Sequence, residues 1–217
     1  MNKKYELTDE TKEIGGVTLH RIRALRDIPR YGVKSGDLGG WIEAESNLSQ
    51  DDDTWVSDDA RVYGNAWVFG NALVTGNAEV SGIAVVCGNA KVYGNAWVYG
   101  DAQVYGEAWV HGNAWVYGNA LVTGNAEVSG NAEVSGNAEV KSIRDYAVFK
   151  NGWSSGRWFT YTRSNRMWRV GCFHGTGEEL IAKAYKDSEL SGKCYEAIVR
   201  AVETIEAAQA ETKGEAK

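Results

Sequence analysis

Proline is nearly absent from this chain of 217 residues, which has a single proline, Pro29, beside 26 glycines. The many turns of such a chain must use glycine, which reaches backbone conformations that other residues avoid. Nine tryptophans and eleven tyrosines exclude a disordered chain, since disordered segments are poor in aromatic residues. The sequence has no apolar run long enough to span a bilayer and no signal-peptide segment after Met1, so we expect a cytoplasmic protein.

Residues that bind metals or form disulfides are also few. The three cysteines are Cys87, Cys172 and Cys194, an odd number at wide spacing, which excludes a disulfide framework and a Cys-x-x-Cys zinc knuckle. The three histidines, His20, His111 and His174, fall in three different regions, so a three-histidine zinc site is not expected. We predict no metal and no cofactor.

Positive charge is scarce in the middle of the chain. Residues 48–140 carry two basic residues against eleven acidic ones, whereas residues 141–217 carry thirteen basic residues against ten acidic ones. Residues 1–47 are balanced, with eight of each sign. A long acidic segment repels phosphates, so general DNA binding is not expected.

A valine recurs every six residues through this acidic segment without a break. The fifteen positions are Val56, Val62, Val68, Val74, Val80, Val86, Val92, Val98, Val104, Val110, Val116, Val122, Val128, Val134 and Val140. Most are followed by x-Gly-Asn-Ala, as in residues 62–66. Because strand neighbours point to opposite faces, an inward valine leaves an outward side chain on each side. Glycine and asparagine both tolerate the left-handed backbone region, so Gly-Asn is expected to form the corner and alanine to fill it.

The repeat predicts a parallel β-helix, because segments this short are stable only when neighbours stack. A flat meander is the alternative, but strands of about three residues are too short for an open sheet. Ile42 and Leu48 extend the repeat backwards, and residues 51–53 then form a two-residue insertion that bulges from a corner. The pattern resembles the left-handed β-helix of hexapeptide-repeat proteins, in which three hexads make one triangular coil.

Three hexads per coil place side chains eighteen residues apart on one face. The residues expected to stack on the outside, as a candidate interface, are Trp97, Tyr99, Trp109, Trp115 and Tyr117. Lys91 is expected beside Trp109 and Tyr93 beside His111. Stacked rings stabilise a sheet by themselves, yet large exposed apolar patches also mark interfaces, and both interpretations stay open. Proteins with this repeat are often trimers, so the resemblance implies a homo-oligomer, with a trimer favoured.

The flanks predict a cap at each end of the β-helix. Residues 5–14 and 17–28 are expected to form a hairpin around Gly15-Gly16 that covers the first coil. Residues 157–163 and 166–173 suggest a second hairpin, and Thr176 to Glu179 has the form of a helix capping box. The expected fold is mainly β: a cap at 1–47, a left-handed parallel β-helix at 48–140 and a small α+β module at 141–217.

Several flanking motifs carry a more specific resemblance. They are Gly-Asp-Leu-Gly-Gly-Trp-Ile-Glu at 36–43, Asn-Leu-Ser at 47–49 and Gly-Cys-Phe-His-Gly-Thr at 171–176. Together with the repeat they are similar to hexapeptide-repeat proteins of uncharacterised function from bacteriophages, prophages and gut bacteria. The resemblance implies no catalytic residues and implies a small accessory protein in the cytoplasm of a bacterial host cell.

A basic and aromatic cluster follows the β-helix. The candidate ligand-binding residues are Arg157, Phe159, Tyr161, Arg163, Arg166, Trp168 and Arg169, with Arg21, Arg23 and Arg26 of the N-terminal flank. Arginine forks bind phosphates and aromatic faces stack on bases. By alternation Arg157, Phe159, Tyr161 and Arg163 share one strand face, which is the expected recognition face, whereas Trp158, Thr160 and Thr162 share the other. A surface hairpin whose arginines pair with the acidic repeat is the competing interpretation.

Three functions fit these observations. The favoured one is a non-enzymatic protein that binds and sequesters a phosphorylated small molecule, such as a nucleotide signal, or a host protein, as a phage counter-defence protein would. The second is an acyltransferase-like enzyme, which would use His111, although no loop interrupts residues 56–140 to build an acyl-carrier site. The third is a structural component of a virion or another self-assembling particle.

Overall fold

The computed structural model describes residues 3–214, which fall into two compact units. The first unit contains residues 1–147 and 162–165, and the second contains residues 148–161 and 166–217. The N-terminal hairpin and the repeat therefore belong to one unit. None of the helices in the described residues is long and apolar enough to cross a bilayer.

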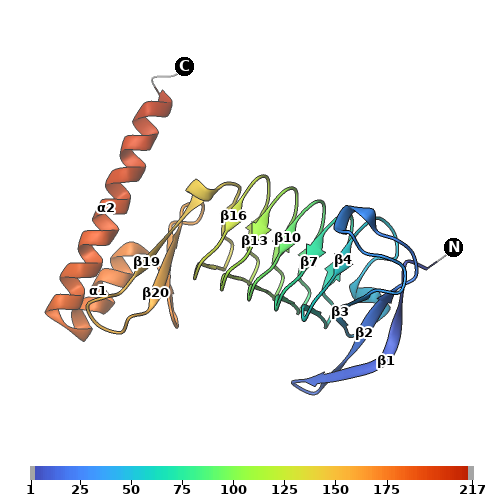
Figure 1. The fold of residues 1–217 in the computed structure, drawn as a ribbon. Coiled ribbons are helices and arrows are strands. Elements are labelled where there is room, and N and C mark those ends of the chain that lie inside the picture. The colour runs from blue at the N-terminus through green and yellow to red at the C-terminus, as the bar shows by residue number, and fades with distance from the viewer. Residues whose placement is uncertain (1–2, 215–217) are drawn as a thin grey trace. The chain divides into compact units, whose positions relative to one another are not determined.

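The repeat folds as a parallel β-solenoid of stacked coils, as the sequence predicts (Figure 1). Its fifteen strands have two residues each. They are β4 Trp55–Val56, β5 Arg61–Val62, β6 Trp67–Val68, β7 Leu73–Val74, β8 Glu79–Val80, β9 Val85–Val86, β10 Lys91–Val92, β11 Trp97–Val98, β12 Gln103–Val104, β13 Trp109–Val110, β14 Trp115–Val116, β15 Leu121–Val122, β16 Glu127–Val128, β17 Glu133–Val134 and β18 Glu139–Val140. Every third strand pairs, which makes three parallel sheets.

The core of the solenoid contains the repeated valines and alanines. All fifteen valines are fully buried, and the alanines from Ala60 to Ala138 are at most 2% exposed. Backbone hydrogen bonds join each coil to the next, such as Trp97 N–H to the Ala114 carbonyl (2.9 Å). These strands are too short to fold alone. They are stabilised by the burial of the valine and alanine side chains and by the hydrogen bonds between coils.

Glycine supplies the left-handed corner residue from Gly64 onward, and Asp58 (φ 56°) supplies it at the corner before. From Gly64 to Gly136 each corner glycine has a φ between 64° and 76°, whereas none of the asparagines that follow has a positive φ. The expectation that Gly-Asn shares this conformation is therefore wrong. The asparagine N–H instead donates to the glycine carbonyl of the next coil, as Asn95 does to Gly112 (2.7 Å). The asparagine amides also stack, with Asn95 Nδ2 3.2 Å from Asn113 Oδ1.

The insertion in the repeat lies where the sequence places it. Ile42 pairs with Val62, and Leu48 bridges to Val68, both at a spacing of twenty residues. Val56 pairs with Val74 at the regular spacing of eighteen. The two extra residues therefore lie between Leu48 and Val56, in the turn that contains residues 51–53.

The N-terminal hairpin extends one sheet of the solenoid. Strand β1 (Tyr5–Ile14) pairs with β2 (Val17–Ala24), which pairs with β3 (Leu38–Ile42), and β3 runs parallel to β5. Strand β2 ends at Ala24, four residues before the expected Ile28. The chain then turns, and Ile28 forms an isolated antiparallel bridge with Val33. Three added strands cover the first edge of this sheet, which would otherwise expose unpaired backbone groups.

The second unit is a sheet covered by helices. The strands of this sheet are β19 (Tyr146–Lys150), β20 (Trp158–Thr162), β21 (Met167–Val170) and β22 (Phe173–Gly175), paired in that order, and residues 146, 147 and 162 of them belong to the first unit. Helices α1 (Gly177–Asp187) and α2 (Glu189–Gly214) follow. The predicted capping box opens α1, where the Thr176 hydroxyl accepts from the Glu179 N–H and the Glu179 carboxylate accepts from the Thr176 N–H. Helix α2 buries Tyr195, Val199 and Val202, whereas Ile205 is 53% exposed.

Candidate functional site

The outward ladders of the solenoid form as the sequence predicts. Trp97 stacks on Trp115 with centroids 5.2 Å apart, and Tyr99 stacks on Tyr117 at 4.9 Å. These four rings, here called the aromatic quartet, lie together on the sheet that contains β11 and β14. Trp109 lies on a different sheet, so the candidate interface residues divide between two faces. Both tryptophans of the quartet are 38% exposed.

The second face pairs a cation with a ring and a histidine with a carboxylate. Lys91 Nζ lies 5.1 Å from the Trp109 ring, and His111 stacks on Tyr93 at 4.6 Å. His111 Nε2 lies 3.0 Å from a carboxylate oxygen of Glu127, which is sixteen residues later in the sequence. His111 is thus held in a stacked ladder on a regular strand face, as sequence alternation indicates.

The arginines of the N-terminal flank form contacts within the N-terminal cap and its neighbouring insertion. Arg21 Nε donates to the Gly39 carbonyl (2.9 Å) and its guanidinium lies 5.1 Å from the Trp41 ring. Arg23 pairs with a carboxylate of β1, Glu6, at 3.1 Å. Arg26 donates to the Asp52 carbonyl (3.0 Å) and so ties the insertion to the hairpin. All three have structural partners within the first unit.

The expected recognition face of the second unit is its core. Phe159 is 1% exposed, Trp168 2% and Tyr161 6%, and all three pack with apolar residues of α1 and α2. The prediction of a recognition face made of Arg157, Phe159, Tyr161 and Arg163 is therefore wrong, because the helices cover the more apolar side of β20. Arg163 also lies in the first unit, where its N–H donates to the Asp145 carbonyl (2.8 Å).

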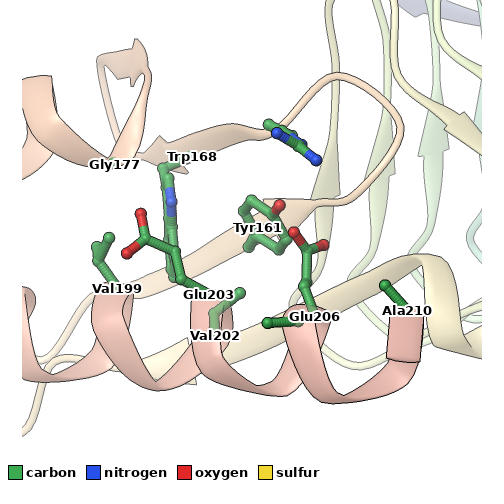
Figure 2. Close-up of a pocket in the computed structure, with 10 residues that line it drawn as sticks. Tyr161, Trp168, Gly177, Val199, Val202, Glu203, Glu206 and Ala210 are labelled. Carbon is green, nitrogen blue, oxygen red and sulfur yellow. The ribbon is translucent and has the colours of Figure 1, made fainter. Parts of the chain in front are cut away.

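A groove of about 410 Å³ remains between the sheet and α2, lined in part by three of the candidate residues, Tyr161, Arg166 and Trp168. Figure 2 shows Trp168 and Tyr161 reaching toward α2, from which Glu203 and Glu206 project beside them. One arginine against two glutamates makes this lining a poor site for phosphates, since like charges repel the ligand. The arginine and the aromatic residues come together here, but in an acidic setting.

The other face of the sheet carries basic and aromatic side chains. In β19 to β22 the core side chains alternate with side chains that point away from the helices. These define the helix-free face, which consists of Val148, Lys150, Trp158, Thr160, Met167, Arg169 and His174. None of them is acidic.

Two contacts organise the helix-free face. Lys150 Nζ lies 5.4 Å from the Trp158 ring, which is 40% exposed, and Arg169 pairs with His174 across β21 and β22. Burial and the Arg169 charge lower the pKa of His174, so the imidazole is neutral at neutral pH and can accept or donate a hydrogen bond. The face therefore combines an exposed indole, two permanent cations and an uncharged imidazole.

Sequence reasoning found this cluster but chose the strand face that the helices bury. Lys150, Trp158 and His174 were outside the predicted site, and of its members only Arg169 lies on the helix-free face. The signal that identifies the buried face is the helix that begins directly after β22. Its apolar residues Leu180 and Ile181 need a partner surface, and the Phe159 side of β20 is the more apolar one.

A scan against protein-family models finds no match to this chain, and a search of curated proteins finds no related sequence.

Proposed function

We propose that this chain is a non-enzymatic binding protein in which the solenoid is a rigid scaffold and the second unit binds the ligand. The ligand is a phosphorylated, base-bearing small molecule such as a nucleotide, and it binds on the helix-free face. The observation that carries the proposal is the Lys150–Trp158 pair on the strand face that also contains Arg169, where none of the seven side chains named above is acidic.

The helix-free face is chemically complementary to such a ligand. A base stacked on an aromatic side chain contributes about 1–3 kcal/mol, whichever base it is. A guanidinium fork offers two parallel hydrogen bonds to a phosphate. Trp158 supplies the stacking ring, and Lys150 and Arg169 supply charge on the same face. The acidic groove of Figure 2 supports the same assignment by elimination, because its two glutamates disfavour an anion.

The proposal includes the biological setting that the resemblance implies. A stoichiometric binder in the cytoplasm of a bacterial host would sequester a nucleotide signal without altering it, as a phage counter-defence protein would. The low positive charge of the solenoid supports a small ligand over long nucleic acid.

Self-association is the second part of the proposal. The aromatic quartet leaves two tryptophans half-exposed on one face, and exposed aromatic clusters are typical of interface centres. We propose that copies of the chain associate through this face, as a trimer. Light scattering on a sizing column tests this: Trp97→Glu should release monomers, whereas Trp67→Glu, on another sheet, should not. A monomeric wild-type chain contradicts this part alone.

Calorimetry against a panel of mono-, di- and cyclic nucleotides tests the binding proposal. Wild-type protein should bind at least one member stoichiometrically and leave it chemically unchanged. Trp158→Ala should weaken binding by about tenfold or more, because the stack is lost. Trp67→Ala is the matched control, since Trp67 is equally exposed on the solenoid. Absence of heat with every member, or turnover of a nucleotide, contradicts the proposal.

A further inference from the structure

A second cavity, of about 240 Å³, opens in the second unit where the loop of residues 151–157 meets α1 and α2. It shares no lining residue with the groove of Figure 2. It also lies on the helix side of the sheet, away from the helix-free face. Its volume is below the range typical of sites for whole cofactors and drug-sized ligands, which indicates a small occupant.

The loop that forms one wall has a fixed shape because Asn151 is buried, at 2% exposure, and organises it. The Asn151 Oδ1 accepts hydrogen bonds from the Ser154 N–H (2.9 Å) and the Ser154 hydroxyl (3.1 Å). Its Nδ2 donates to the Tyr195 hydroxyl of α2 at 2.9 Å. Gly156 turns the loop with a φ of 67°. The hydroxyls of the wall are therefore held in place before any ligand arrives.

Two cations face this wall. Arg157 comes from the end of the loop and Lys183 from α1, with Asp187 as the acidic residue of the lining. Within residues 3–214, neither cation forms a salt bridge, and nor does Asp187. The Arg157 guanidinium lies over Gly171, with Nη1 3.2 Å from the point where a Cβ would be, so a glycine there leaves the space that the guanidinium occupies.

The tyrosine of the wall can donate a hydrogen bond into the cavity. Its oxygen accepts from Asn151, so the hydroxyl proton remains for another acceptor. Burial, and then the charge of Asp187, raise the pKa of Tyr195, which keeps this proton in place at neutral pH. An anion in the cavity would thus meet two positive charges and a hydroxyl donor.

We infer that this cavity binds a small phosphoryl anion, either inorganic phosphate or a phosphate monoester. Arg157 and Lys183 supply the charge, and the Tyr195 hydroxyl supplies a hydrogen bond. The inference is independent of ligand binding on the helix-free face, because no residue belongs to both surfaces.

Calorimetry on the full chain tests the inference, with inorganic phosphate, glycerol 3-phosphate and acetate as separate titrants. Phosphate and the monoester should bind saturably, and Arg157→Met or Lys183→Met should each weaken binding by about tenfold, as expected for loss of one charged hydrogen bond. Arg157→Lys should retain part of the affinity, which separates a lost contact from a lost fold. Lys186→Met, at an exposed α1 position outside the lining, is the control and should change nothing.

Three results would overturn it: no saturable heat with either phosphate, equal affinity for acetate, or unchanged affinity in both methionine variants. Trp158→Ala should leave phosphate binding intact. A failure of nucleotide binding on the helix-free face is therefore distinguishable from a failure of this cavity to bind phosphate.

Discussion

Lys150 and Trp158 face each other from the ends of β19 and β20, with the ammonium 5.4 Å from the indole centroid. They flank the loop of residues 151–157, so the same short segment positions the pair on one face of the sheet and the phosphate cavity on the other. A cation over an indole contributes about 0.5–1 kcal/mol at an exposed site and limits the rotation of the ring. The stacking surface is therefore preorganised, which lowers the entropic cost of binding.

The corner glycines of the solenoid should be required by stacking as well as by backbone conformation. Gly112 and Gly130 have nearly equal φ, 71° and 66°, but a Cβ on Gly112 would lie 3.0 Å from the Gly130 nitrogen, whereas a Cβ on Gly130 would meet nothing within 4 Å. Both alanine variants should lose about 1–2 kcal/mol of stability to left-handed strain. Gly112→Ala should lose more, because the next coil must move.

Urea denaturation of both variants measures the difference. Equal losses at the two positions would show that conformation alone selects glycine at the corners.

The Trp97–Trp115 stack should couple the stability of two coils. A double-mutant cycle with alanine at each position should give a coupling free energy of about 0.5–1.5 kcal/mol, as expected for stacked aromatic pairs. The cycle between Trp97 and Trp109 is the control, since those residues lie on different sheets and should be additive. A coupling near zero for the stacked pair would mean that the stack contributes to association rather than to folding.

Lys4 should make the stability of the first unit depend on pH. Its side chain is fully buried, and Nζ donates to the Thr54 carbonyl (2.8 Å) and the Asp51 carbonyl (3.1 Å). Burial, and then the charge of Arg26, lower the pKa of Lys4 from 10.5 to about 7. Below about pH 7 both folded and unfolded chains bind this proton, and the folded chain bears the full cost of the buried charge.

As the pH rises above about 7, the folded chain releases the proton first, so the free energy of unfolding should increase until the unfolded chain also releases it, near the ordinary lysine pKa of 10.5. Lys4→Met should remove this increase, whereas Lys3→Met, at an exposed lysine paired with Glu45, should keep it. Urea denaturation at a series of pH values provides the measurement. Parallel pH profiles for wild type and Lys4→Met would show that this lysine does not titrate in the range.

The solenoid was predictable because its period fixes every contact. Once Val98 and Val116 are inward and eighteen residues apart, the partners of Trp97 and Tyr99 follow without further information. The second unit was less predictable because β20 has large or β-favouring residues on both faces. Trp158 and Phe159 are both aromatic, and only the position of α1 and α2 decides which one is buried. The burial of Lys4 was not predictable at all, since it depends on the carbonyl groups of an insertion fifty residues away.

The indole N–H signals of the nine tryptophans, followed by NMR during titration with a nucleotide that binds, test the central claim most directly. The Trp158 signal, assigned by its absence from Trp158→Phe, should shift with saturation, while the signals of Trp97 and Trp115 on the solenoid should stay in place. A shift of Trp168 without Trp158 would place the ligand in the groove beside α2, and a titration that moves no indole signal would contradict binding on the helix-free face.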